Sequence, residues 1–277
     1  MGASSDKIVV SGTAGDVLET SALFAVDLQR RTSRKLSVAA PERCGDASFQ
    51  FPQRLHDGAL ALVRYCLGRP GSALGRSVNL VRLTNDAATV PIVPYKLPFF
   101  VGRFSIRADG RGVINDGRGL SERLLWLGRN RLRPLASSWA RAGQPAWSPD
   151  GRRIAVAAST TADSPRSPEA TWSLFLLDPE GRPTRKLVDG IRGPMRPAWS
   201  PNGRLLALTM TWTDGVRGIY IIDVHHGTVR LSRVGRDYGN TTWIDNSRLV
   251  AAVHPTADTS DRGKGGIEEL RLSALSH

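Results

Sequence analysis

Helical patterns are what this sequence lacks most. No stretch repeats its apolar residues every 3.6 positions, so we expect almost no helix. The sequence also has no run of 18 apolar residues, the length that a helix needs to cross a bilayer. Aromatic residues make up 6% of the chain and cysteine occurs twice. These absences exclude helical bundles, helical membrane proteins and disulfide-rich mini-proteins.

The residue patterns of catalysis and metal binding are also scarce. No Gly-x-Ser-x-Gly nucleophile elbow occurs, and GIRGPMR at 190–196 lacks the lysine and the following helix of a phosphate-binding loop. The five histidines fall in four separate segments, with His225 and His226 adjacent, and no Cys-x-x-Cys spacing is present. We therefore expect no metal site and no cofactor, and an enzyme is the less favoured class.

An internal repeat is the strongest positive signal. The segment PAWSPDGRRIAV from Pro145 to Val156 returns as PAWSPNGRLLAL from Pro197 to Leu208. Each copy predicts a short strand ending in tryptophan, a tight turn and a second strand. The turn follows because proline presets φ and glycine tolerates positive φ. Repeats of this length are typical of architectures that stack one small unit many times.

Weaker copies extend the repeat along the whole chain. A third strand ends at Asp27, Asp178 or Asp223, and a shorter fourth strand follows. The turn positions recur at intervals of 41 to 52 residues, and they are Asp6, Asp57, Asp109, Asp150, Asn202 and Asn246. Four strands at this period indicate a β-propeller. We predict an all-β fold, a six-bladed β-propeller of four-stranded antiparallel blades in one domain over 1–277, with five blades as the alternative.

The first and last repeats are incomplete. The first lacks an innermost strand and the last lacks an outermost one. Because an exposed strand edge is a liability, we expect the termini to meet, with residues 8–10 pairing with residues 270–272.

The repeat motif also resembles a known family. The pattern Trp-Ser-Pro-[Asp/Asn]-Gly, followed by an apolar strand that ends in aspartate, resembles the TolB-type propeller repeat, a cousin of the WD-type repeat. Units 145–188 and 197–232 match closely, and the others are degenerate. The resemblance implies the fold and suggests a binding scaffold. It does not identify a ligand, because propellers host many unrelated activities.

The N-terminus leaves two interpretations of the protein's location open. The start MGASSDK is small and polar, and we expect residues 1–5 to be a flexible tether. The protein is either an intact cytoplasmic one or the mature part of an exported one. In the second case Gly-Ala-Ser-Ser resembles the tether of a bacterial lipoprotein, with Met1 where the lipidated cysteine would stand. TolB-type propellers are commonly exported, which favours an extracytoplasmic location.

The two cysteines agree with export. Cys44 and Cys66 flank a predicted hairpin, and their midpoint, residue 55, lies beside its turn at 56–58. Residues equidistant from a hairpin turn face each other at separations that a disulfide can bridge. We therefore name them as a disulfide candidate, which would imply an oxidising compartment. Two separate buried thiols are the alternative.

The charge balance is strongly basic. The formal net charge is +13, from 38 basic and 25 acidic residues. A basic surface favours an anionic partner such as an envelope polymer, a lipid headgroup or nucleic acid. The alternative is a solubilising surface of scattered arginines. Because no nucleic-acid motif occurs, we expect no sequence-specific nucleic-acid binding.

The connections between blades are the predicted binding site. They lead from the outermost strand of one blade to the innermost strand of the next, at the mouth of the predicted channel. Aromatic planes beside guanidinium groups suit an anionic or stacking ligand. The candidate ligand-binding residues are Tyr95, Lys96, Trp139, Arg141, Arg192, Arg196, Arg236, Asp237 and Tyr238.

Three functions remain open at this point. The first is a non-catalytic extracytoplasmic scaffold, a monomer that binds a protein or an anionic envelope component. The second is a lyase or hydrolase in which Asp237 and Tyr238 transfer protons, helped by a tyrosine pKa that nearby cations lower. The third is a cytoplasmic interaction module.

Overall fold

The structure is a computed structural model of the chain. It describes residues 7–12, 22–39, 44, 46–55, 59–67, 77–84, 88–95, 97, 101–107, 109–116, 123–135, 139–160, 170–254 and 266–272. These residues form 23 strands and no helix. The chain folds as two units, the first comprising Met1–Asp116 and Leu125–Arg133 and the second Gly117–Leu124 and Pro134–His277.

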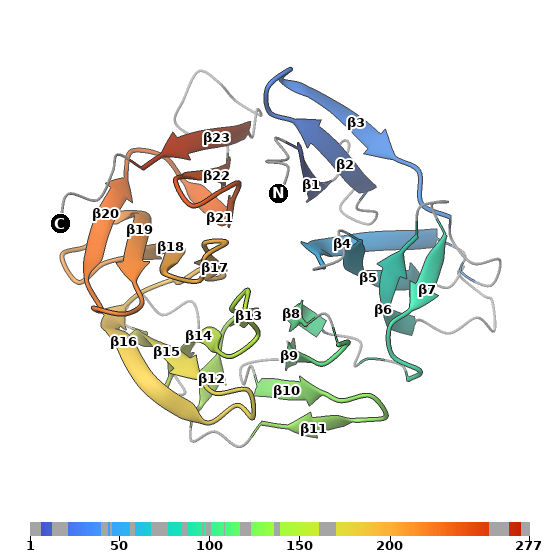
Figure 1. Cartoon of the computed structure of the whole chain (residues 1–277), viewed down its shortest axis with the longest axis horizontal. Coiled ribbons are helices and arrows are strands. Elements are labelled where there is room, and N and C mark those ends of the chain that lie inside the picture. Colours follow the sequence, from blue (N-terminus) through green and yellow to red (C-terminus); the bar gives the residue numbers. More distant parts are fainter. Residues whose placement is uncertain are drawn as a thin grey trace. The chain divides into compact units, whose positions relative to one another are not determined.

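The first unit holds three sheets of consecutive strands (Figure 1). One consists of β1 (Lys7–Gly12), β2 (Ala22–Asp27) and β3 (Thr32–Leu36). The next consists of β4 (Asp46–Arg54), β5 (Leu60–Leu67), β6 (Ser77–Leu83) and β7 (Thr89–Pro91). The third consists of β8 (Val101–Ile106), β9 (Gly112–Asp116), β10 (Arg123–Leu127) and β11 (Leu132–Pro134), and the division between the units passes through β10 and β11.

The second unit repeats the same plan. Its first sheet contains β12 (Arg141–Ala142), β13 (Ala146–Trp147), β14 (Ile154–Ser159), β15 (Trp172–Leu177) and β16 (Pro183–Ile191). Its second contains β17 (Ala198–Trp199), β18 (Leu205–Thr211), β19 (Arg217–Asp223) and β20 (Val229–Arg233). Its third contains β21 (Tyr238–Trp243), β22 (Arg248–Val253) and β23 (Gly266–Arg271).

The strand order confirms the predicted fold class, a six-bladed β-propeller. Each sheet is a blade made of strands that follow one another along the chain and pair with their neighbours. β12 and β13 both pair with β14, so together they occupy one strand position. Within the described residues the first and last blades have three strands, as their incomplete repeats indicated, rather than four. The single-domain boundary and the pairing of residues 8–10 with 270–272 stay predictions.

The Ser-Pro-Asp-Gly repeat forms a self-contained turn. In the fourth blade the Ser148 hydroxyl donates to the Asp150 carboxylate at 2.5 Å and accepts from the Arg153 backbone N–H at 2.9 Å. Gly151 has a φ of 65°, which explains why glycine stands there. In the fifth blade Ser200 and Asn202 repeat the pattern, with 2.8 Å between the Ser200 hydroxyl and the Asn202 side-chain oxygen. The repeat in sequence is therefore a repeat in hydrogen bonding.

In the fifth and sixth blades the tryptophan of the repeat connects the blade to the one before it. The Trp199 indole N–H donates to the Ala146 carbonyl at 2.9 Å. The Trp243 indole N–H donates in the same way to the Ala198 carbonyl, also at 2.9 Å. In both cases the acceptor is the residue before the preceding blade's tryptophan. The guanidinium of Arg153 lies 5.2 Å from the centre of the Trp199 ring, which adds a cation–π contact.

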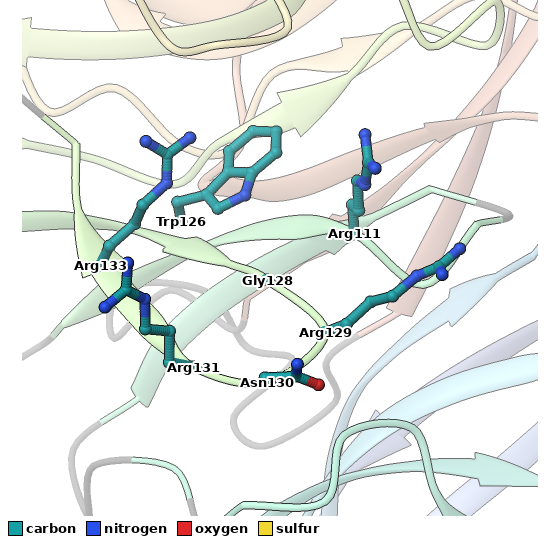
Figure 2. A pocket seen from close by; sticks show the side chains of 7 residues that line it. All are labelled: Arg111, Trp126, Gly128, Arg129, Asn130, Arg131 and Arg133. Atoms are coloured by element: carbon teal, nitrogen blue, oxygen red, sulfur yellow. The ribbon is translucent and has the colours of Figure 1, made fainter.

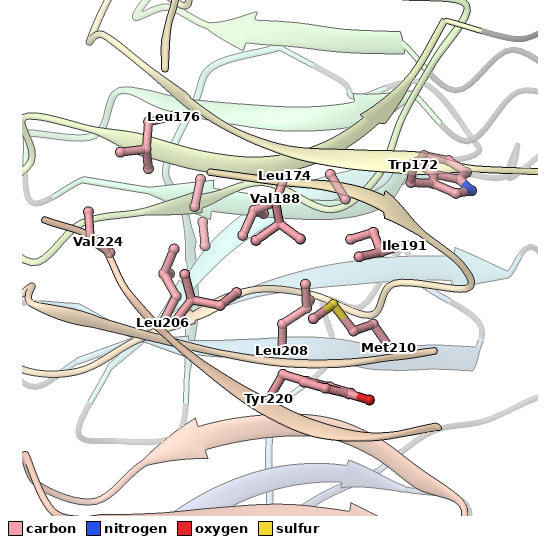
Figure 3. Packing of buried hydrophobic residues seen from close by; sticks show 14 of the residues in the cluster. Trp172, Leu174, Leu176, Val188, Ile191, Leu206, Leu208, Met210, Tyr220 and Val224 are labelled. Atoms are coloured by element: carbon pink, nitrogen blue, oxygen red, sulfur yellow. The ribbon is translucent and has the colours of Figure 1, made fainter. Parts of the chain in front are cut away.

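The hydrophobic core of the second unit lies between neighbouring blades (Figure 3). Leu206, Leu208 and Met210 of β18 pack toward the fourth blade, whereas Leu205 and Ala207 of the same strand pack toward the sixth. Successive side chains of a strand point to opposite faces, so a strand between two blades is buried on both. This explains the unbroken apolar run LLAL at 205–208 in the sequence.

Trp199 should therefore be a major determinant of stability. Trp199→Ala should reduce the free energy of unfolding by about 3–5 kcal/mol, as large-to-small core substitutions do. Trp199→Phe retains most of the packing and should lose only about 1–2 kcal/mol, mainly the hydrogen bond. Urea denaturation would measure both variants, with half-buried Trp212→Ala as the control. A loss below about 1 kcal/mol for Trp199→Ala would contradict the role of the indole as an anchor.

The recurring aspartate at the end of the third strand closes the next turn. Asp223 accepts backbone N–H groups of His225 at 2.8 Å and His226 at 2.9 Å. Asp178 does the same for Glu180 and Arg182. Burial of Asp223 favours its neutral form, but its bonds to His226 and His225 and its contact with Arg204 outweigh this and lower the pKa to about 2. The carboxylate thus stabilises the folded state as an anion.

Acid should remove that stabilisation. Because the folded pKa lies below the ordinary value, the contribution of Asp223 is complete above about pH 4 and decreases as pH falls toward 2. At pH 7 Asp223→Asn should be less stable than the wild type by about 1–2 kcal/mol. Thermal midpoints from pH 7 to pH 3 should show the difference narrowing, and exposed Asp214→Asn serves as the control. A difference that stays constant over this range would contradict the assignment.

Candidate functional site

The structure brings two of the predicted inter-blade connections together in the second unit. The backbone of Arg192 exchanges two 2.9 Å hydrogen bonds with Thr211, at the end of β18. The Arg217 guanidinium lies 3.4 Å from the Asp237 carboxylate, and a side chain at Gly193 would lie 3.5 Å from the same guanidinium. Arg217 therefore lies between the connection that contains Arg192 and the one that contains Asp237.

Three of the candidate residues are exposed on this surface. Arg192, Arg236 and Asp237 are exposed, and Arg196 is half-buried with its backbone N–H 3.3 Å from the side-chain oxygen of Asn240. These four residues are available to a partner to different degrees. Lys96 lies outside the described residues.

The aromatic candidates serve packing instead. The Tyr95 hydroxyl donates to the Gly128 carbonyl at 2.7 Å, and burial raises its pKa to about 12. The Trp139 ring packs on Phe175 with 5.0 Å between ring centres. Both rings hold strands and turns of their own unit together.

Two further candidates, Arg141 and Tyr238, are buried. Arg141 and Tyr238 are each 1% exposed, so neither side chain lies on the surface as expected. Arg141 belongs to a short inner strand, and its guanidinium lies 6.0 Å from the Trp172 ring centre. Tyr238 begins β21 and points toward Glu268 of β23, with 3.1 Å between the hydroxyl and the carboxylate. Sequence spacing placed both in connections, whereas strand pairing takes them inside.

A shallow pocket forms around Glu268. Its volume is about 390 Å³, and it is lined by Arg233, Val234, Gly235, Arg236, Tyr238, Ile267 and Glu268. Glu268 accepts from Arg233 at 2.8 Å and lies 3.9 Å from Arg236. Sequence analysis missed Arg233 and Glu268, because they meet only when β20 and β23 come close.

The electrostatics of this pocket argue against the proposed proton transfer. Burial and the Glu268 carboxylate raise the pKa of Tyr238, and the opposing effect of Arg233 and Arg236 is weaker. The two arginines act in the expected direction, but the pKa of Tyr238 is raised overall and not lowered as the enzyme hypothesis required. No group of three or more histidine, cysteine, aspartate or glutamate side chains in the described part of the chain could hold a metal ion.

A second pocket, in the first unit, is lined by arginines (Figure 2). Arg129 and Arg131 lie on the β10–β11 turn, Arg133 follows them in β11, and Arg111 joins them from the β8–β9 turn. None of these arginines was among the candidates predicted from the sequence. The alternation of arginines was visible, but the approach of Arg111 was not.

Cys44 and Cys66 form a disulfide in the structure, with a Cα–Cα distance of 5.1 Å. The symmetry argument that suggested it is wrong in detail. Cys66 pairs with Ala47 across the hairpin, so Cys44 lies ahead of β4 rather than opposite Cys66 in the ladder. The hairpin closes at Arg54 and Leu60, later than the midpoint of the two cysteines, and a bulge shifts the register between Gln50 and Gln53.

Comparison with known proteins supports the fold and leaves the activity open. No family model matches the chain. The solved structure of TolB from Acinetobacter baumannii superposes with a TM-score of 0.62 at 15% identity, covering 91% of this chain and 57% of that one. A TolB-type protein of Agrobacterium tumefaciens gives a TM-score of 0.62 at 16% identity, covering 90% of this chain and 84% of that one.

The chain has the fold of the TolB β-propellers. A curated relative, the uncharacterized peptidase YuxL of Bacillus subtilis (strain 168), is 33% identical over 82 residues. Those residues are 30% of this chain, and they span 11% of the peptidase. Among the described residues of this TolB-like propeller, no helix is long and apolar enough to cross a membrane.

Protein made under oxidising conditions should contain the Cys44–Cys66 bond. The bond closes a loop with a sequence separation of 22, which the loop-entropy estimate values at about 3 kcal/mol. Intact-mass analysis after alkylation without reductant would detect it. Cys44→Ser/Cys66→Ser should lower the free energy of unfolding by that amount. Two alkylated thiols in the wild-type protein would overturn this prediction.

Proposed function

We propose that the protein is a non-catalytic, extracytoplasmic propeller scaffold that binds a protein or an anionic envelope component. The observation that carries the proposal is the likeness to TolB over nine-tenths of the chain. The disulfide supports a location outside the cytoplasm, because such bonds persist in oxidising compartments. Attachment through a lipid stays a prediction.

The composition of one surface supports a macromolecular partner. Beside Arg233 and Arg236, the side chains of Leu231, Val234 and Ile267 are exposed by 47%, 47% and 38%. Arginine next to exposed apolar groups is typical of interface centres, where apolar contact supplies affinity and guanidinium groups supply specificity. A partner that carries carboxylates or phosphates beside apolar groups would complement this surface.

A hydrolase is the second candidate, favoured by the likeness to a peptidase. That likeness covers 30% of the chain and a small part of the peptidase. The residues first considered for proton transfer do not support it, because Tyr238 has a raised pKa and Asp237 pairs with Arg217. The scaffold is therefore the function that the site supports better.

Charge reversal on the connections should weaken binding. In Arg192→Glu/Arg236→Glu, two exposed cations become anions, and the affinity for an anionic partner should fall at least about tenfold. Biolayer interferometry of the immobilised protein against the solubilised envelope fraction of its own organism would measure the change. The thermal midpoint should stay nearly unchanged, since both side chains are exposed.

The control makes the same charge change elsewhere in the second unit. Arg152→Glu/Arg230→Glu also reverses two exposed arginines, and it should bind like the wild type. Equal binding by both double variants and the wild type would refute this surface as the binding site. Loss of binding in the control variant alone would indicate that the partner binds the surface that carries the Asp-Gly turns.

A further inference from the structure

We propose that the arginine pocket of the first unit binds a multivalent phosphate group. The arginine pocket is the set of residues Arg111, Trp126, Gly128, Arg129, Asn130, Arg131 and Arg133, which encloses about 390 Å³. It involves none of the residues of the proposed scaffold surface. The proposal of phosphate binding can therefore be tested independently of the proposed function.

Two turns of the third blade build the pocket. The Gly128 N–H donates to the Arg131 carbonyl at 3.1 Å, which closes the β10–β11 turn around Arg129 and Asn130. The Tyr95 hydroxyl donates to the Gly128 carbonyl at 2.7 Å and anchors the same turn from the neighbouring blade of the first unit. Hydrogen bonds at Gly128 and at Arg131 thus fix the two ends of the turn that carries Arg129.

The fourth arginine comes from the β8–β9 turn. The Arg111 carbonyl accepts the Arg107 N–H at 2.7 Å, and the Arg111 N–H donates to the Asp109 carboxylate at 3.1 Å. Figure 2 shows the side chain of Arg111 across the pocket from Arg131 and Arg133. The pocket therefore receives cations from two sides.

Trp126 forms the wall and orients one cation. Trp126 is 9% exposed, and the Arg133 guanidinium lies 5.4 Å from the centre of its ring. A cation over an indole is held in place before any ligand binds, so less side-chain conformational entropy is lost on binding. The same geometry disfavours nucleic acid, because base stacking needs an open aromatic face.

Three of the four arginines of the pocket carry a charge that no ion pair in the described part of the chain compensates, and the fourth, Arg111, lies near one carboxylate. Asp109 is the acidic neighbour, and it lies 3.6 Å from Arg107 and 3.9 Å from Arg111. Within the part of the chain that the structure describes, Arg129, Arg131 and Arg133 form no ion pair. Like charges held together on one turn repel each other, so an anion that bridges them is strongly favoured.

The guanidinium groups select the chemical class of the anion. Their planar forks donate two parallel hydrogen bonds to a phosphate, and several of them match an anion with several phosphoryl groups. The pocket volume exceeds what one small oxyanion fills. A free oligophosphate and the phosphates of a lipid headgroup share this chemistry.

Isothermal titration with sodium tripolyphosphate at 50 mM NaCl tests the proposal. We expect binding that weakens steeply at 200 mM NaCl and that falls at least about tenfold in Arg129→Ala/Arg131→Ala. The control Arg34→Ala/Arg123→Ala removes two exposed arginines outside the pocket and should change affinity less than about twofold. Citrate, a carboxylate of similar charge, should bind more weakly than tripolyphosphate.

A site-specific signal separates pocket binding from adsorption to a basic protein. Tripolyphosphate should change the tryptophan fluorescence of the wild type, and Trp126→Phe should remove that change while circular dichroism shows a folded protein. Sedimentation with phosphatidic acid vesicles, against phosphatidylcholine vesicles, then distinguishes a headgroup from a free oligophosphate. Either source supports the site. No binding to either probe, or equal loss in the control variant, overturns it.

Discussion

A hydrogen bond from an indole to a backbone carbonyl is the interaction on which the second unit depends. Trp199 and Trp243 each donate to the blade before them, one residue ahead of that blade's own tryptophan. The bond joins innermost strands that are only two residues long in β13 and β17. Such short strands gain little from their own ladder, so their position depends on the side chain that crosses to the next blade.

The turn beside each tryptophan keeps this arrangement regular. The Asn246 side chain accepts the Asn202 N–H at 2.9 Å, and the Arg153 guanidinium donates to the Gly203 carbonyl at 3.3 Å. Turns of consecutive blades therefore contact each other as well as their own strands. The polar turn and the apolar strands between blades belong to the same repeating unit. Both therefore recur at the same period in the sequence.

The sequence predicted local structure well because the repeat acts locally. Ser148 and Asp150 bond to backbone groups within five residues, so their chemistry is readable from order alone. The disulfide pair was also predicted, although the ladder places Cys66 opposite Ala47. That error arose because a bulge and a later turn change the register, and neither leaves a mark in residue spacing.

The candidate site was predicted less well, because it depends on which side of a strand a residue faces. Arg141 and Tyr238 were assigned to the connections between blades, but they belong to strands β12 and β21, and both are buried. The arginine pocket was missed for the opposite reason. Its members lie on the β8–β9 turn, at Arg111, and along the β10–β11 hairpin, from Trp126 to Arg133, and only the folded blade brings these two segments together. Residues that meet through strand pairing are invisible to a reading along one segment.

The two pockets differ in how the protein handles positive charge, and this difference separates their chemistry. Around Glu268, Arg233 donates to the carboxylate at 2.8 Å, so the charge of Arg233 is partly neutralised within the protein. Around Trp126, an aromatic face orients Arg133 without neutralising it. The first arrangement favours a partner that adds apolar contact to modest charge complementarity, and the second favours an anion that supplies the missing charge. Neither pocket contributes to the Trp–carbonyl contacts, so both surfaces can change in sequence while the blades that carry them remain in place.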